Sequence, residues 1–398
     1  MTVDPWVVIL VVALALIFDF TNGFHDTANA MATPIATRAL TPRTAVALAA
    51  VLNLVGAFLS TEVALTVSHG LINEDPGTGG VAITPAFVFA GVLAAIVWNI
   101  ATWLFGLPSS SSHALFGGLI GAAIVGAGVG AVHWGTVLDK VVIPALASPL
   151  VAGITAFLAT RVVYWMTRRN DGHPNGRGRF RIAQIFSSSL VALAHGTNDA
   201  QKTMGVITLA LVSAGMIPRE EGVPLWVIVS CALAIAIGTY TGGWRIIRTL
   251  GSGLTDVKPA QGFAAETSTA VTILASSHLG FALSTTQVAS GSVIGSGLGR
   301  RGSTVRWGTA GRVAAGWVLT LPAAALVGAI LALLALLGTV GVVLGTVAGA
   351  LAIGAMVLVA RRTSIGAEST ASDVSVAGEA VAIKPRRRAR AAGRGRRA

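Results

Sequence analysis

The chain has 398 residues, of which 54% are hydrophobic and only 11% are charged, and its mean hydropathy is +0.76. Several apolar runs reach the roughly 20 residues that one α-helix needs to cross a bilayer, which excludes a soluble globular protein and predicts an all-α polytopic membrane protein. The net charge of +12 lies in short loops and a tail beside these runs, where it sets membrane orientation and does not indicate nucleic-acid binding. A single cysteine, Cys231, excludes a disulfide framework and Cys-based metal sites.

The first part of the chain, residues 1–165, is predicted to form one membrane repeat. Its first segment, 6–37, is too long for one simple span and contains the polar stretch N-G-F-H-D-T-A-N-A-M at 22–31. We therefore expect a helix that is broken near 22–26. Further apolar segments follow at 44–69, 85–130 and 134–166. The second of these is split by Pro108 and a run of serines, which predicts a helical hairpin that is either re-entrant or fully spanning.

The second part of the chain repeats this plan. A basic loop at 166–181, expected to be cytoplasmic, leads into a second membrane repeat at 182–360. The first segment of that repeat carries the stretch A-H-G-T-N-D-A-Q-K-T-M-G at 194–205. A later segment, 262–297, is split at S-T-T, which predicts a second hairpin. The tail at 361–398 is basic and rich in Ala, Gly and Ser, so we expect it to be disordered and cytoplasmic.

Matching spacings indicate that the chain is duplicated. Asp26 and Asp199 are 173 positions apart, and Ser110 and Ser284 are 174 positions apart. The basic loops fall on one predicted side of the membrane and the acidic loop at 73–80 on the other, which places the N-terminus outside and the C-terminus in the cytoplasm. We therefore predict two inverted-topology repeats with about 10–12 membrane helices, an architecture typical of secondary transporters that bind substrate near the midplane.

The two hairpin tips carry hydroxyl groups at predicted helix starts. Hydroxyls in such positions cap backbone N–H groups, and the same N–H groups and the helix dipole together attract an anion. The alternative is that these residues only cap and pack membrane helices, which two clusters at matching repeat positions make less expected. The candidate anion-binding residues are Ser110, Ser111, Ser112, Ser284, Thr285 and Thr286.

The polar stretches place two carboxylates at membrane depth, where charge is costly and is a functional candidate by default. Asp26 and Asp199, with Asn29 and Asn198, offer oxygen ligands for a hard cation or a proton. A protonated phosphate also donates its P–OH to a carboxylate, whereas fully ionised sulfate cannot. The alternative is a structural polar network between helices.

A third acidic residue, Glu266, lies in the arm before the second hairpin tip and is either a proton carrier or a paired structural acid. No nucleophile elbow, phosphate-binding loop or metalloprotease motif is present, so the sequence predicts a protein that is not an enzyme and needs no cofactor.

The paired motifs resemble those of the inorganic phosphate transporter (PiT) family, over about residues 6–360. The family's G-x-N-D core matches 23–26 and 196–199, and its P-x-S-T-T-H break matches 108–113, with a partial match at 282–287. The resemblance implies cation-coupled phosphate uptake across the cell inner membrane by a multi-pass protein. A sulfate or other oxyanion permease and an anion channel are the alternatives, and the sequence leaves homo-oligomer formation open.

The resemblance also implies roles for individual residues. Substrate binding falls to the hairpin tips with Asn29, Asn198 and Gln201, and ion coupling falls to His25, Asp26, Asp199, Lys202 and Glu266, with no resident metal ligand. His25 stands where many members have Asn, and Lys202 stands opposite Asn29. Bacterial low-affinity members share these forms, which implies proton coupling in place of sodium and acceptance of neutral metal–phosphate complexes.

Overall fold

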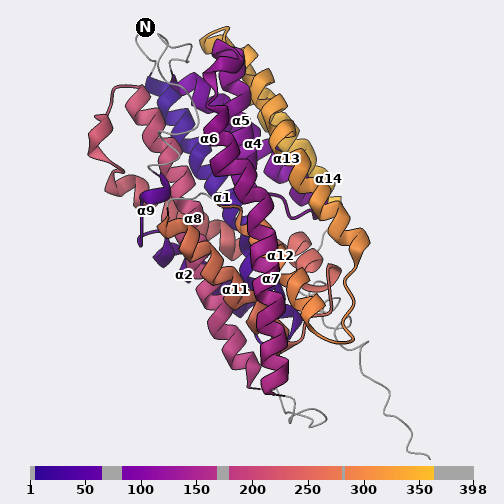
Figure 1. Cartoon of the computed structure of the whole chain (residues 1–398). Helices are drawn as coiled ribbons and strands as arrows, with labels where there is room; N and C mark the ends of the chain where they lie inside the picture. The colour runs from indigo at the N-terminus through magenta and orange to yellow at the C-terminus, as the bar shows by residue number, and fades with distance from the viewer. Residues whose placement is uncertain (1–4, 65–82, 168–178, 280–282, 363–398) are drawn as a thin grey trace, which may run out of the picture.

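The computed structural model describes residues 5–64, 83–167, 179–279 and 283–362, and these form an elongated bundle of helices (Figure 1). The described residues contain no strand beyond one isolated bridge between Thr255 and Val305. The acidic loop expected at 73–80 lies outside the described residues. So do most of the basic loop at 166–181 and almost all of the tail.

The first half supplies five long helices. The helices α4 and α7 both have a proline in the first helical turn, where proline is favoured. The bounds are α1 Pro5–Ala36, α2 Pro42–Gly56, α4 Pro85–Leu104, α5 Ser111–Ala127, α6 Trp134–Val137 continued by a π-helical turn Leu138–Val142, and α7 Ile143–Met166.

The second half repeats this order and ends with one additional helix. Its bounds are α8 Phe180–Ser213, α9 Leu225–Thr241, α10 Trp244–Arg248, α11 Pro259–His278, α12 Thr285–Gly299, α13 Trp307–Ala335 and α14 Thr339–Arg362. The helices α4 and α11 both start at a proline 174 positions apart, and α14 follows the counterpart of α7. Among the described residues, eleven helices have 15 residues or more, in agreement with the predicted 10–12 membrane helices.

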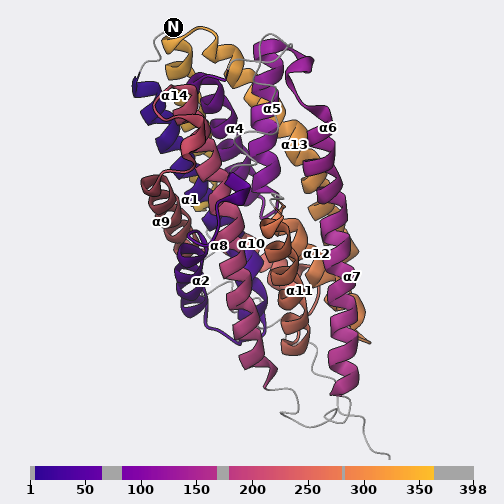
Figure 2. The same cartoon turned by 60° about the vertical axis from the view of Figure 1, so that its left-hand side comes forward.

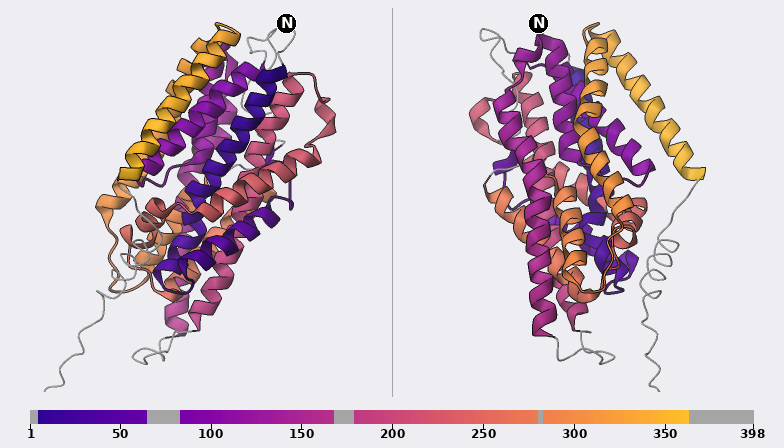
Figure 3. Two further views of the ribbon diagram at one scale, coloured as in Figure 1. Left: turned by 180° about the vertical axis from the view of Figure 1, so that it is seen from behind. Right: turned by 45° about the vertical axis from the view of Figure 1, so that its right-hand side comes forward.

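Equivalent helices of the two halves make equivalent contacts across the molecule. The helix α1 packs on α9 as α8 packs on α2, and α5 packs on α13 as α12 packs on α7. Each repeat therefore completes the other, and the two halves are intertwined (Figure 3). This exchange supports the predicted duplication, while the opposite membrane orientation of the repeats stays a prediction.

Glycines set the closest of these helix contacts in matching pairs. A Cβ at Gly56 would lie 2.3 Å from the carbonyl oxygen of Leu193, and a Cβ at Gly238 would lie 2.1 Å from that of Phe20. Phe20 and Leu193 are themselves 173 positions apart. Helices in lipid gain no hydrophobic driving force from associating, so their contact depends on close packing. Small residues permit such backbone contact.

The expected break near 22–26 is wrong. The helix α1 is continuous through this stretch, and α8 is continuous through the equivalent stretch at 194–205. Several of the polar side chains, among them Asp26 and Asn29, find partners on other helices, and the backbone keeps its own hydrogen bonds, which lipid would not replace. Gly23 instead allows α1 to approach α9, since a Cβ there would lie 2.2 Å from the carbonyl oxygen of Ile235.

The breaks fall elsewhere, and two of them form the predicted hairpins. The helices α4 and α5 pack together, as do α11 and α12, with a non-helical tip between the members of each pair. Figures 1 and 2 place α4 and α5 toward the end of the bundle near the N-terminus, and α11 and α12 toward the opposite end. A further break separates α9 from α10 by a 59° bend at the Gly242–Gly243 pair.

The outer helices indicate which part of the molecule crosses the membrane. Five described helical spans are long and apolar enough to cross a bilayer, and six if α9 and α10 form one bent span. The spans formed by α6–α7, α13 and α14 expose most of their apolar side chains, as a lipid-facing surface does. The more polar helices α8, α11 and α12 lie largely buried behind them.

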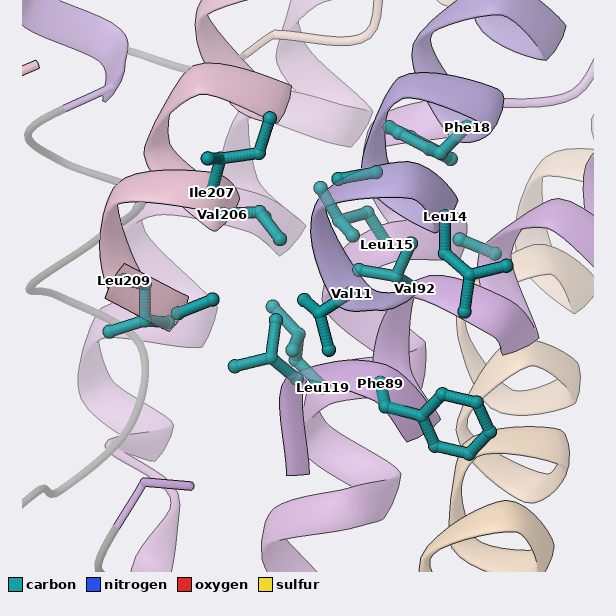
Figure 4. Close-up of a cluster of buried hydrophobic side chains, with 14 of the residues drawn as sticks. Val11, Leu14, Phe18, Phe89, Val92, Leu115, Leu119, Val206, Ile207 and Leu209 are labelled. Atoms are coloured by element: carbon teal, nitrogen blue, oxygen red, sulfur yellow. The ribbon is translucent and has the colours of Figure 1, made fainter. Parts of the chain in front are cut away.

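The apolar core fills the half of the bundle nearer the N-terminus. Figure 4 shows side chains of α1, α4, α5 and α8 meeting there, among them Val11, Leu14, Val92 and Val206. Each of these four is less than one-tenth exposed. This part of the bundle therefore has a dry, close-packed interior.

We expect Gly56→Ala and Gly238→Ala to destabilise the protein to a similar extent, each by about 1–3 kcal/mol, because the added Cβ overpacks a backbone contact. Thermal unfolding of the detergent-purified protein measures this as a lowered melting temperature. The control is Gly354→Ala on α14, where a Cβ meets nothing within 4 Å. Equal melting temperatures for all three variants would contradict the glycine contacts.

Candidate functional site

The two hairpin tips end in equivalent helix caps. Ser110 and Ser284 are the N-cap residues of α5 and α12, with φ/ψ of −93°/108° and −82°/104°. The Ser110 Oγ accepts the backbone N–H of His113 at 3.2 Å, and the Ser284 Oγ accepts that of Gln287 at 3.3 Å. These two candidates thus stabilise their helix starts, and the residues that follow them face the opposite hairpin.

The carboxylate of Asp26 on α1 is the first meeting point of the tips. It accepts hydrogen bonds from the hydroxyls of Thr286 at 3.1 Å and Thr285 at 3.3 Å, both on α12. Ser111 of α5 donates to it at a longer 3.5 Å. The Asn29 amide, one turn further along α1, donates to Thr286 Oγ1 at 3.0 Å. Three predicted site residues on α5 and α12 therefore donate to this carboxylate, and a fourth, Asn29, donates to one of them.

The carboxylate of Asp199 on α8 is the second meeting point. Thr285 Oγ1 lies 3.0 Å from Asp199 Oδ2, so this single hydroxyl lies between the two carboxylates. The Lys202 ammonium pairs with Asp199 Oδ1 and also donates to the Leu283 carbonyl at 3.0 Å. Ser112 Oγ reaches the same carbonyl at 3.4 Å. Lys202 is fully buried, and its pairing compensates a charge that would otherwise be costly to bury.

Two histidines lie against these carboxylates. His25 Nδ1 lies 2.6 Å from Asp26 Oδ1. His195 Nε2 lies 2.8 Å from Asp199 Oδ2 and 3.8 Å from Asp26 Oδ2, between the carboxylates. Two acids, one lysine and two imidazoles thus occupy a volume from which water is largely excluded.

His195 is the residue that the sequence interpretation missed. It lies in the polar stretch of α8 four positions before Asp199, and residues four apart share a helix face, which is the signal that identifies it. Its Nδ1 faces Asn53 Oδ1 of α2 at 3.3 Å. Ser109 was also missed, and its hydroxyl lies 3.4 Å from His25 Nε2.

Three predicted site residues lie away from the tips. Gln201 Oε1 accepts the backbone N–H groups of Val63 at 2.7 Å and Ala64 at 3.3 Å, where a new helix starts. Asn198 is fully buried, and within the described residues its amide makes no hydrogen bond. Glu266 belongs to a separate network. None of these three side chains is hydrogen-bonded to the hydroxyls of the tips within the described residues.

The Glu266 carboxylate is surrounded by donors from α1 and α8. It accepts hydrogen bonds from the hydroxyl of Thr33, from Gln184 Nε2 at 3.0 Å and from Ser187 Oγ at 2.6 Å. The Gln184 amide is a donor in this network, whereas the hydroxyls of Thr33 and Ser187 can either donate or accept.

A cavity of about 10 Å³ lies between this network and the hydroxyl cluster. It is lined by Asn29, Thr33, Glu266 and Thr269 among apolar side chains. This volume is close to the smallest that holds one water molecule, which also needs polar partners of this kind. The cavity therefore connects Asn29 at the tips with Glu266 toward the opposite end of the bundle.

The equivalent positions in the other half of the bundle are apolar. Offsets of 173 and 174 relate Thr33 to Val206 and Glu266 to Val92. Both valines belong to the core shown in Figure 4. The hydroxyl cluster is thus closed by packed hydrocarbon on one side and continued by polar groups on the other.

The acids and His195 could also hold a cation. The facing ligand atoms of Asp26, His195 and Asp199 all lie within 4.8 Å of one another. The sequence interpretation assigned no resident metal ligand, and here Lys202 already pairs with one of the carboxylates. The arrangement can bind and release protons or a cation, and it can accept hydrogen bonds from an acidic anion.

Comparison with known proteins identifies the same regions. Two matches to the profile described as "Phosphate transporter family" cover residues 22–178 and 167–328. A Mycobacterium tuberculosis protein named "Probable low-affinity inorganic phosphate transporter" is 58% identical over 330 residues, 83% of this chain and 78% of that protein. A Rhizobium meliloti protein of the same name is 46% identical over 320 residues, 80% of this chain and 93% of that protein.

A solved structure supports the fold. The chain resembles "The sodium-dependent phosphate transporter" with a TM-score of 0.73 at 23% sequence identity, over 83% of this chain and 99% of that one. The family matches contain both polar stretches and both hairpin tips, which are the parts that build the buried cluster. This chain therefore belongs to the phosphate transporter family, whose members are transporters and not enzymes.

Proposed function

We propose that this protein imports inorganic phosphate across the cell membrane, with the anion bound between the tips of α5 and α12. The observation that carries the proposal is the position of Thr285, whose hydroxyl lies within hydrogen-bond distance of both Asp26 and Asp199 and can donate its single hydrogen to either. A group that bridges two carboxylates of equivalent helices marks the point where the two repeats converge. In transporters with internal repeats, the substrate binds at such a point.

Phosphate suits the chemistry of this point. The first turns of α5 and α12 present backbone N–H groups and the positive ends of their dipoles to an anion. Ser111, Thr285 and Thr286 donate hydroxyl hydrogen bonds to its oxygens, and the carboxylates of Asp26 and Asp199 accept from its P–OH groups. Fully ionised sulfate has no such donor, so the carboxylates discriminate against it.

The basic residues favour a proton as the coupling ion. The 173-residue offset pairs Asn22 with His195, His25 with Asn198 and Asn29 with Lys202. In each pair one repeat carries an amide and the other a basic residue, so an imidazole or an ammonium stands where a second amide oxygen would otherwise coordinate sodium. Imidazole also titrates near physiological pH.

His195 is the strongest candidate for the proton carrier. Its two ring nitrogens face oxygen acceptors of Asn53 and Asp199, an arrangement satisfied when both nitrogens carry hydrogen. His25, Asp26, Asp199 and Glu266 complete the carrier set, and Glu266 serves as a relay beyond the small cavity. A divalent cation of a neutral metal–phosphate complex would enter as cargo and face the two carboxylates and His195.

We expect Ser111→Ala and Thr285→Ala each to raise the apparent KM for phosphate about two- to tenfold, since one neutral donor contributes roughly 0.5–1.5 kcal/mol. Radiolabelled uptake by proteoliposomes measures this, and excess sulfate should compete poorly. Thr267→Ala is the matched control, because its hydroxyl bonds only to the Phe263 carbonyl at 2.7 Å. Unchanged kinetics in both site variants would exclude the tips as the binding site.

We expect uptake to persist in sodium-free buffer and to collapse when a protonophore removes the proton gradient, because Lys202 occupies the position opposite Asn29. Proteoliposomes with separately imposed proton and sodium gradients distinguish the two ions. Uptake that requires sodium and tolerates a protonophore would contradict proton coupling. A flux that ignores both gradients and does not saturate would indicate a channel.

We expect Thr78→Cys to react with an impermeant thiol reagent in intact cells and Arg177→Cys to react only after permeabilisation, in a Cys231→Ser background. Both positions lie outside the described residues, in loops that the charge distribution assigns to opposite sides. The opposite labelling pattern would invert the predicted orientation of both termini.

A further inference from the structure

A large apolar groove lies beside the hairpin helices, away from the carboxylates. Its volume is about 1030 Å³, at the upper end of the range of about 300–1,000 Å³ that is typical of ligand sites. The walls come mainly from α7, α12 and α13, including Leu146, Ile154, Leu298 and Val318. His113 and Gln287 supply polar groups at its floor.

The groove opens at membrane depth. Two of the three wall helices, α7 and α13, belong to spans that are long and apolar enough to cross a bilayer. Leu146 is 65% exposed and Val318 is 71% exposed. Figure 2 shows α7 running the length of the bundle beside α12. A ligand in this groove therefore enters from the hydrocarbon region of the membrane.

One end of the groove carries a positive charge. Phe157 of α7 lines the groove, and the guanidinium of Arg161, one turn further, lies 5.2 Å from the centre of the Phe157 ring. Arg161 is exposed and stands seven residues before the basic stretch at 168–181. An arginine in this position attracts an anionic headgroup at the membrane interface. An apolar channel that ends in a cation matches an anionic amphiphile.

We propose that the groove binds an acyl chain of an anionic phospholipid, whose headgroup phosphate lies on Arg161. The chain reaches His113 and Gln287, which are the third residues of α5 and α12. The first turns of those two helices form the hydroxyl cluster. Lipid in the groove thus packs against the rear of both hairpin tips and holds them in register, so the transport rate depends on the anionic lipid content of the membrane.

Native mass spectrometry of the full-length purified protein tests lipid binding directly. Phosphatidylglycerol and phosphatidylcholine with identical acyl chains are added in turn, and retained lipid is counted. The protein should retain phosphatidylglycerol preferentially. Arg161→Gln should lower that preference about fivefold, the equilibrium equivalent of the roughly 1 kcal/mol that one arginine gains near an anionic membrane surface.

Two adjacent alanines of α13 provide a matched pair. Ala314 and Ala315 are both exposed, but only Ala314 lines the groove. Ala314→Phe fills the groove and should abolish lipid retention together with the stimulation of uptake by phosphatidylglycerol in liposomes. Ala315→Phe should preserve both. Val318→Trp fills the same groove and replaces Ala314→Phe if that variant does not fold.

Several results would overturn the assignment. Equal lipid retention by the Ala314→Phe and Ala315→Phe proteins would show that the groove is not the binding site. An unchanged preference in Arg161→Gln would remove the headgroup contact. Crosslinking between two protomers through Ala314→Cys, in a Cys231→Ser background and without retained lipid, would assign the groove to a second copy of the chain.

Discussion

The compensation of two buried carboxylates organises this protein. Asp26 and Asp199 are each at most 1% exposed inside a bundle whose outer helices face lipid. An isolated charge in such an environment costs several kcal/mol or more, so each carboxylate must gather donors and cations. The two carboxylates are contacted by hydroxyls of both hairpin tips, by two imidazoles and by the Lys202 ammonium. The fold must therefore bring α1, α5, α8 and α12 together at a single point.

The packing of small residues makes that convergence possible. Helices α1 and α8 carry their carboxylates on continuous backbones, and glycines let α9 and α2 approach them at backbone contact distance. Among the described residues, breaks lie at the hairpin tips and at the α9–α10 bend, where Pro108, Ser109, Gly242 and Gly243 are buried. In a membrane this division is required, because lipid cannot satisfy exposed backbone groups.

The two halves are equivalent in backbone but differ in side chains, so the two ends of the bundle differ in polarity. Packed valines and leucines close the half of the bundle near the N-terminus, whereas Glu266, Gln184 and Thr33 occupy the matching positions on the other side. Water and protons cross polar interiors more readily than apolar ones. The two ends of the bundle therefore differ in polarity next to the buried cluster, although their backbones are equivalent.

The sequence by itself determined the class of protein, the duplication, the positions of both hairpins and most of the buried cluster. Hydropathy, the 173- and 174-residue offsets and the Ser/Thr runs can be read from the sequence directly, because none of them depends on which helices pack together. The same signals placed a helix break at 22–26, where none exists, because polar residues within an apolar run look like an interruption until their partners on other helices are known.

The tertiary structure decided which polar residues meet. His195 joins both carboxylates, while Glu266 and Gln201 serve separate networks, although all three lie in comparable polar surroundings in the sequence. The groove between α7 and α13 also depends on how helices of different repeats pack, since α7 ends at Met166 and α13 begins only at Trp307. Such contacts arise from the exchange of helices between repeats, a long-range property that no local pattern encodes.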